Sequence, residues 1–373
     1  MSQPAEMKET GSWLPSETLI SRIKCSYRMA LNNTHPSQDS KMASWIKRSY
    51  QKVTRKEVLL KESARWSTIA SKQKDIHNAL LSDDQSAAEL LSNPAKTNLY
   101  YGVDNLAEDI VAKMTSTCEG SGQELRKMVE TLVIAIGQNL ILNPQGGEKF
   151  RDKSSQPSLS TEEYLQKINS ALGMEVRFPN PFAGELGIKT TQGMISYRAI
   201  PAIYQAYRMR QICHFTEGYD CLEIGAGMGR TVFYAHQLGL RCTVIDLPMT
   251  IVGQALFLSA ALGEDAIWML GDTMPKENRI LLLPPSELDT LERDFNVVLN
   301  SDSLTEMGRE TALDYMKYIE NHAQFFISIN HEFNHFTIKE ISALTSTLMP
   351  LSRCLYWLRE GYVEEVFSVR KKL

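Results

Sequence analysis

The run 221–230 combines an acidic side chain with three closely spaced glycines, in the order Cys-Leu-Glu-Ile-Gly-Ala-Gly-Met-Gly-Arg. Glycine suits such a turn because the chain bends sharply and a ligand can lie against the backbone. In an open α/β sheet, ligands bind outside the carboxyl ends of the strands. The pattern therefore predicts a ligand site around four residues, namely Glu223, Gly225, Gly227 and Gly229.

Two further acids follow predicted strands. Asp246 ends the second strand, about 20 residues beyond the glycine turn, where a carboxylate can accept hydrogen bonds from both hydroxyls of a ribose. Asp272 follows the third strand. A dinucleotide-binding loop would place its third glycine at position 230, which is occupied by Arg230. This departure disfavours a nicotinamide dinucleotide as the ligand.

Candidates for acid–base chemistry follow the next two strands, which end at 300–307 and 330–332. His331 is the best-suited base by residue type because its charge changes near neutral pH. Its competitors are Asp302, Glu306 and Glu332, and a hydrogen-bonded loop histidine is the alternative reading of His331. Asp302 with Glu332 could instead hold Mg²⁺ through oxygen ligands, although no spacing in the sequence indicates a metal.

Strands alternating with helices must position these side chains. The sequence predicts strands at 219–224, 241–245, 266–270, 295–299 and 324–329, followed by a hairpin of strands at 354–358 and 363–369. The predicted helices between them cover 230–238, 250–262, 309–321 and 336–348. This alternation is typical of an α/β fold with a seven-stranded, mostly parallel sheet and an antiparallel edge hairpin.

Three regions are expected along the chain. Residues 1–142 are predicted to be mainly helical, 143–195 to form a linker and an irregular lid segment, and 196–373 to form the ligand-binding domain. Ser160 and Glu163 resemble a capping box that starts a helix through Ala171. Within the second region, 179–196 is the expected mobile cover, and the helical N-terminal region is expected to complete the substrate pocket.

Composition excludes several classes of protein. The 373 residues are 43% hydrophobic and 23% charged with a net charge of −4, which is typical of a globular protein and disfavours a nucleic-acid partner. The six cysteines form no CxxC pair, so we expect reduced thiols and a cytoplasmic protein. No apolar run reaches the ~20 residues that an integral membrane helix needs. Homo-oligomerisation is left open.

From 219 to the C-terminus the chain resembles the class I S-adenosylmethionine-dependent methyltransferases, which share the Rossmann-like fold and an acid followed by alternating glycines. It is most similar to sugar O-methyltransferases found with bacterial surface-polysaccharide genes. The matching motifs are LEIGAGMGR (222–230), VIDLP (244–248) and NSDSLTEM (300–307), with weaker similarity at 99–102 and 196–213.

The resemblance implies S-adenosylmethionine as cofactor and assigns each predicted residue a role. Glu223, Gly225 and Gly227 would contact the methionine part, Asp246 would hold the ribose, and Asp272 would lie at the adenine end. Gly229, Leu247 and Asn300 would also lie at the cofactor, and Glu306 would lie on the acceptor side.

The expected reaction is methyl transfer to a sugar hydroxyl, on a nucleotide-linked sugar or a surface polysaccharide glycan. The alternatives are another small-molecule acceptor, an NAD-dependent sugar-modifying oxidoreductase, and a non-catalytic nucleotide-binding module. A DNA amino-methyltransferase is disfavoured because 300–303 lacks an Asn/Asp-Pro-Pro-Tyr motif.

Overall fold

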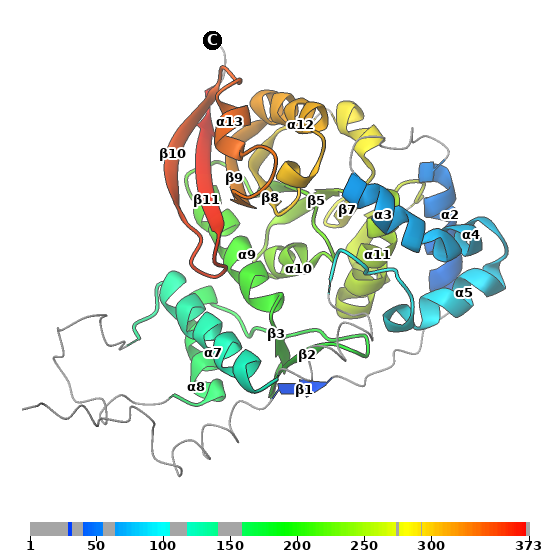
Figure 1. The fold of residues 1–373 in the computed structure, drawn as a ribbon, viewed down its shortest axis with the longest axis horizontal. Helices are drawn as coiled ribbons and strands as arrows, with labels where there is room; N and C mark the ends of the chain where they lie inside the picture. Colours follow the sequence, from blue (N-terminus) through cyan, green and yellow to red (C-terminus); the bar gives the residue numbers. More distant parts are fainter. Residues whose placement is uncertain are drawn as a thin grey trace, which may run out of the picture.

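The computed structural model describes residues 29–31, 40–54, 64–104, 118–140, 159–273, 276–291 and 293–370. Its centre is an eight-stranded sheet (Figure 1). The strands are β4 (Asp220–Ile224), β5 (Arg241–Ile245), β6 (Ile267–Met269), β7 (Ile280–Leu283), β8 (Phe295–Ser301), β9 (Ala323–His331), β10 (Leu348–Leu355) and β11 (Tyr362–Val369).

The strand order creates a natural place for a ligand. Across the sheet the order is β10-β11-β9-β8-β4-β5-β7-β6, and all neighbouring pairs from β9 to β6 are parallel. The chain runs outward from β4 to β5 on one side, and it returns through β8 on the other. The order therefore reverses between β4 and β8, and a crevice opens there at the carboxyl ends of the strands.

Apolar side chains cover both faces of this sheet. Alternate residues of each strand point to opposite faces, so Cys221 joins one buried cluster and Leu222 the other. Five helices pack on the sheet: α9 (Ala199–Cys213), α10 (Arg230–Gln237), α11 (Pro248–Leu262), α12 (Arg309–His322) and α13 (Ile338–Ser342). Buried side chains of α9, α10 and α11 belong to the first cluster, and those of α12 and α13 to the second.

The sheet has eight strands, so the expectation of seven was wrong. The additional strand is β7, an Ile-Leu-Leu-Leu run buried on both faces that shows no polar alternation. It pairs between β5 and β6, which moves β6 to the edge of the sheet. The expected helix at 336–348 is only the short α13, and β10 of the antiparallel hairpin begins at Leu348.

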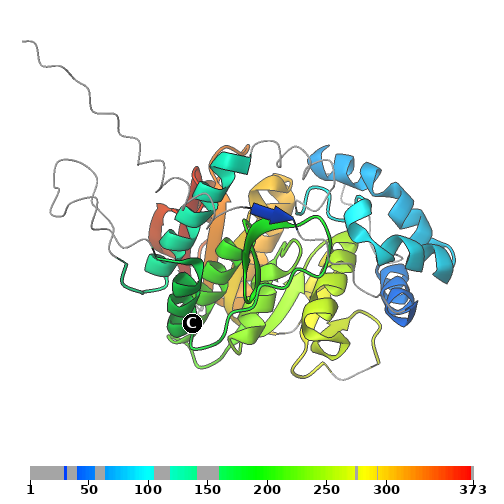
Figure 2. The ribbon, with the colours of Figure 1, turned by 90° about the horizontal axis from the view of Figure 1, so that it is seen from below.

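The described residues of the N-terminal region are mostly helical and include one strand. Its helices are α2 (Ser40–Thr54), α3 (Ala64–Lys72), α4 (Lys74–Leu81), α5 (Asp84–Ser92) and α7 (Cys118–Ala135). The strand β1 (Met29–Leu31) joins β2 (Leu186–Thr190) and β3 (Gly193–Ser196) in a small antiparallel sheet. Figures 1 and 2 show α2–α5 at one end of the molecule and α7 with α8 (Thr161–Leu172) at the other.

The expected lid segment contains regular structure. The helix α8 (Thr161–Leu172) begins at the capping box of Ser160 and Glu163, as predicted. The strands β2 and β3 then form a hairpin within the expected mobile cover. Ser196 is the last residue of β3, and α9 begins at Ala199. Residues 143–158 of the expected linker lie outside the described residues.

The N-terminal region docks on α11 through Tyr100. This side chain is 2% exposed, its ring lies against Phe182, and its hydroxyl donates to the Gly253 carbonyl oxygen at 3.0 Å. Gly253 has no side chain at this contact, and a Cβ there would lie 2.9 Å from the Tyr100 ring.

Within the described ranges, no helix has both the length and the apolar character that a membrane-crossing segment needs.

We predict that Tyr100→Phe lowers the free energy of unfolding by about 1 kcal/mol, because a buried hydrogen bond is lost while the ring is kept. Urea denaturation measures this change. Tyr101→Phe is the matched control, since the adjacent ring is half-buried and its hydroxyl lies outside the contact with α11. Equal losses in both variants would contradict the docking role of Tyr100.

Candidate functional site

A cavity of about 1060 Å³ opens at the carboxyl ends of β4, β5 and β8, where the strand order reverses. This is large for a small-molecule site and leaves room for more than one ligand group. Eight of the predicted site residues or their neighbours line it: Glu223, Gly225, Gly227, Asp246, Leu247, Asp302, Ser303 and Glu306.

The glycine turn brings the backbone directly against this cavity. Gly225, Gly227 and Gly229 all have positive φ angles, of 73°, 57° and 90°. Glycine adopts this conformation readily, whereas other residues are strained there. A Cβ at Gly225 would also overlap the Ser303 side chain. Gly225 and Gly227 line the cavity, while Gly229 precedes α10 and faces Leu258.

Two carboxylates lie buried at neighbouring strand ends. Glu223 near the end of β4 is 3% exposed, and Asp246 directly after β5 is 7% exposed. Burial and the nearby Asp246 raise the pKa of Glu223 to about 8. Burial raises the pKa of Asp246 to about 7, although hydrogen bonds from Leu247 and Gln254 oppose it. One oxygen of Glu223, Oε2, has no hydrogen-bond partner among the described residues.

Asp246 is held in place by α11. Its Oδ1 accepts from the Leu247 amide at 2.8 Å, and its Oδ2 accepts from Gln254 Nε2 at 2.7 Å. Gln254 Nε2 also donates to the Gly227 carbonyl oxygen at 3.0 Å. The fully buried side-chain amide of Gln254 thus connects Asp246 to the glycine turn. This connection fixes the distance between Asp246 and the turn, which both face the ligand.

Asn300 lies behind the cavity and does not line it. It is fully buried, and its Nδ2 donates to the Ile224 carbonyl oxygen at 2.8 Å. Its Oδ1 accepts from Asn330 Nδ2 at 3.0 Å. These bonds join the ends of β4, β8 and β9, so the structure gives Asn300 a role in positioning the strand ends.

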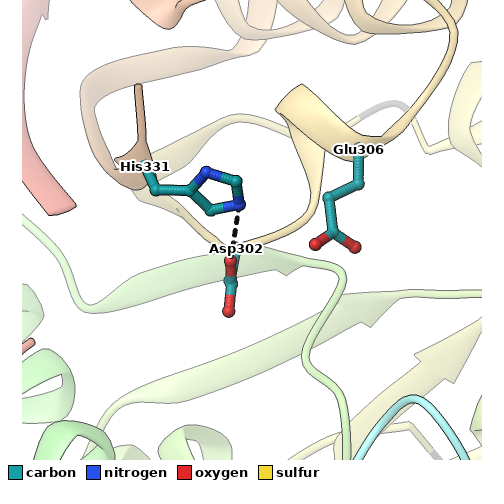
Figure 3. A group of neighbouring side chains, drawn as sticks. All are labelled: Asp302, Glu306 and His331. Carbon is teal, nitrogen blue, oxygen red and sulfur yellow. Dashed lines mark ion pairs between the residues drawn. The ribbon is translucent and has the colours of Figure 1, made fainter. Parts of the chain in front are cut away.

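Figure 3 shows the three predicted acid–base residues, Asp302, Glu306 and His331, as neighbours. One side-chain atom each of Asp302, Glu306 and His331 lies within 4.8 Å of the other two. Asp302 and Glu306 line the cavity, whereas His331 lies next to Asp302, with 3.9 Å between Nε2 and Oδ1. The sequence therefore identified three residues that the fold does bring together.

Asp302 has an unusual backbone and strong partners. Its φ of 60° is uncommon for a residue other than glycine, and such conformations concentrate at functional sites. Its carboxylate accepts from Arg359 Nη1 and from the Tyr362 hydroxyl, both at 2.9 Å. Burial alone would raise the pKa of Asp302, but Arg359 and Tyr362 hold it below its ordinary value. Asp302 therefore remains ionised.

Glu332, the other predicted competitor and metal ligand, lies elsewhere. Its carboxylate accepts from Arg353 Nη2 at 2.6 Å on the outer hairpin. A divalent ion would instead have to use the cluster of Asp302, Glu306 and His331. The guanidinium of Arg359 already occupies Asp302 and disfavours a second positive charge there.

Asp272 does not line the cavity. The sequence analysis placed it at the cofactor because it follows the third predicted strand. Since β7 pairs with β5 instead, Asp272 follows the edge strand β6, and Pro285 after β7 lies in the cavity wall. The preceding Gly271 contacts the N-terminal region, where Lys52 Nζ donates to the Gly271 carbonyl oxygen at 3.1 Å.

The cover of the cavity comes from the N-terminal helices. Residues of α2, α3 and α4 line it, including Tyr50, Trp66 and His77, together with the turn that ends at Asp104. No described residue of 159–195 lines it. The expected cover at 179–196 is therefore wrong, whereas the described helices of the N-terminal region do line the pocket that this region was expected to complete.

Arg230 explains how that cover is attached. It lines the cavity at the start of α10, and it is 7% exposed. Its Nε donates to Asp104 at 3.0 Å, and its Nη2 lies 2.7 Å from Glu185. The residue that replaces the third dinucleotide glycine thus bridges the ligand turn, the N-terminal region and the segment before β2.

No protein-family model and no curated protein matches the chain. Several solved structures match part of it. One is a protein from Pyrococcus horikoshii, 11% identical, which covers 44% of this chain and 91% of its own with a TM-score of 0.34. Another is a TehB-like SAM-dependent methyltransferase from Corynebacterium glutamicum, 14% identical, with coverages of 44% and 87% and a TM-score of 0.34.

A third is the N-methyltransferase NodS from Bradyrhizobium japonicum, solved with S-adenosyl-L-homocysteine. It is 12% identical and covers 45% of this chain and 86% of its own, with a TM-score of 0.34. At this level of similarity the matches do not assign an activity or a substrate to this chain. That assignment has to rest on the cavity itself.

The two buried acids predict a pH-dependent stability. A carboxyl group whose folded pKa is raised binds its proton more tightly in the folded state, so its contribution to stability is lost as the pH rises. For Glu223 this loss runs from its ordinary pKa of 4.5 through about 8. We expect the melting temperature of the unliganded protein to fall over this range, and Glu223→Gln to flatten the fall.

Thermal unfolding at closely spaced pH values measures both slopes. Glu217→Gln is the control, because this glutamate is exposed and lies outside the cavity. Equal pH slopes for the wild type and Glu223→Gln would show that folding does not raise the pKa of Glu223.

Proposed function

We propose that this chain is an S-adenosylmethionine-dependent O-methyltransferase that acts on a hydroxyl of a sugar or glycan. The observation that carries the proposal is the pair of buried carboxylates, Glu223 and Asp246, at adjacent strand ends beside a glycine turn. Such a pair is unfavourable unless a ligand with positive charge or several hydrogen-bond donors accompanies it.

The residues present fit that cofactor. The unpartnered Oε2 of Glu223 can accept from the ammonium group of the methionine part, which compensates the buried negative charge. Asp246 can accept from the ribose hydroxyls, and Pro285 and Leu247 provide apolar contact farther along the cavity. When bound, the cofactor supplies an electrophilic methyl group on its sulfonium.

The acceptor end is assigned to Asp302, Glu306 and His331. Because their side-chain atoms lie within 4.8 Å of one another, an oxygen centred among them would be within about 2.8 Å of each, which is hydrogen-bond distance. A hydroxyl held there could give its proton to His331, the proposed base. The ionised Asp302 would then stabilise the imidazolium through their close contact.

The alternatives are less well supported by the same residues. An NAD-dependent oxidoreductase would have its third glycine at position 230, where it lets the helix pack closely on the strand, but this chain has Arg230 there, buried between two acids. A magnesium-assisted reaction would have to displace Arg359 from Asp302. The sugar acceptor rests on the resemblance of 300–307 to sugar O-methyltransferases.

Ligand binding tests the cofactor assignment. We expect S-adenosylhomocysteine to raise the melting temperature and NAD to leave it unchanged, because only a ligand of the native state stabilises it. By calorimetry, Asp246→Ala should weaken S-adenosylhomocysteine at least about tenfold, since hydrogen bonds to a buried charge are lost. Asp272→Asn is the matched control and should keep wild-type affinity. Stabilisation by NAD alone would refute the proposal.

Turnover tests the assignment of the base. His331→Ala should lose at least about 100-fold in kcat, within the range that general-base catalysis contributes, while its affinity for S-adenosylhomocysteine stays unchanged. Glu332→Gln, a change in the adjacent residue that faces Arg353, should retain turnover. Methyl transfer should also survive dialysis against EDTA. Wild-type turnover of His331→Ala would remove His331 as the base.

A further inference from the structure

Three arginines line the cavity, and they differ in how their charge is compensated: Arg198, Arg230 and Arg359. Arg230 lies between Asp104 and Glu185, at 3.0 Å and 2.7 Å. Arg359 donates to Asp302 at 2.9 Å, and its guanidinium lies 3.8 Å from the centre of the Tyr362 ring. The charges of both of these side chains are therefore compensated by protein partners.

Arg198 is different. Its Nε is buried and has no hydrogen-bond partner among the described residues. The nearest carboxylate is that of Asp302, but Nη1 lies 4.0 Å from Oδ2, which is beyond hydrogen-bond distance. Asp302 already accepts from Arg359 and Tyr362, so it has little capacity left for Arg198. A buried donor without a partner is unfavourable and is expected to be satisfied by a ligand.

The position of Arg198 suggests what that ligand group is. Arg198 immediately precedes α9, whose first-turn residues Pro201 and Ala202 also line the cavity. The side chain is 33% exposed, so it remains accessible from the cavity. Guanidinium groups bind carboxylates and phosphates through paired hydrogen bonds. Because Arg198 neighbours Asp302, such an anion would lie close to the acceptor hydroxyl.

We propose that the methyl acceptor is an anionic saccharide whose carboxylate or phosphate is bound by Arg198, beside the hydroxyl held at Asp302, Glu306 and His331. This inference rests on the proposed function and specifies its substrate class. Arg198 is a specificity-determining residue in this account. Arg359 compensates the charge of Asp302, which lowers the repulsion that this carboxylate would exert on the anion.

The test is a binding titration with the protein saturated with S-adenosylhomocysteine. The probes are D-glucuronate for the carboxylate, D-glucose 1-phosphate for the phosphate, and D-glucose as the neutral analogue, each followed by ligand-observed NMR. We expect at least one anionic probe to bind about tenfold or more tightly than glucose, as hydrogen bonds to a charged group predict. The stronger of the two anionic probes identifies the source of the charge.

Variants of Arg198 test whether this residue causes the preference for an anionic probe. Arg198→Gln should remove the preference for the anionic probe, and Arg198→Lys should retain part of it. Both should bind S-adenosylhomocysteine with wild-type affinity. Arg177→Gln is the matched control, because Arg177 is exposed and lies outside the cavity.

Each remaining outcome is decisive. Equal binding of all three probes, an anion preference that survives in Arg198→Gln, or no binding of either anionic probe to the saturated protein would overturn the inference. Failure of S-adenosylhomocysteine to bind at all would refute the proposed function itself, and calorimetry with that ligand alone distinguishes this result from the others.

Discussion

The burial of two carboxylates at adjacent strand ends is the constraint on which this structure depends. Glu223 and Asp246 are removed from water by the sheet, by α11 and by the N-terminal cover, and their pKa values rise accordingly. A fold that only had to be stable would not place two acids together in this way. The glycine turn beside them keeps the backbone open to a ligand, so the unfavourable burial coincides with the place where a ligand can compensate it.

The buried guanidinium of Arg230 also carries a charge that has to be compensated. It is surrounded by Asp104 and Glu185, so its charge is compensated inside the protein and not by a ligand. Breaking a buried ion pair by removing one partner is strongly unfavourable, and the three segments that supply these side chains are thereby held together. The cover that closes the cavity is thus attached at the same turn that contacts the ligand. Tyr100 of the N-terminal region provides a second attachment through its hydrogen bond to the Gly253 carbonyl oxygen of α11.

Much of this arrangement could be predicted from the sequence where local pattern decides structure. The turn around Gly225 and the strands β4 and β5 are marked by their own residues, and β5 has the predicted bounds. β7 could not be recognised because a short apolar run without alternation suits a strand or a buried helix equally well. Because β7 was not predicted, Asp272 was wrongly expected at the cavity. Its position depends on the strand order and not on its neighbours in the chain. Arg359 and the N-terminal cover reach the site only through tertiary packing.

The titration of the two buried acids can be followed directly by carbon-13 NMR of the side-chain carboxyl groups of Glu223 and Asp246, with and without S-adenosylmethionine. We expect the pair to titrate near neutral pH in the unliganded protein, with apparent pKa values that belong to both groups together. The cationic ligand should shift this titration to lower pH. Titration of both groups at ordinary carboxyl values without ligand, or no response to S-adenosylmethionine, would show that the two acids do not form the cofactor site.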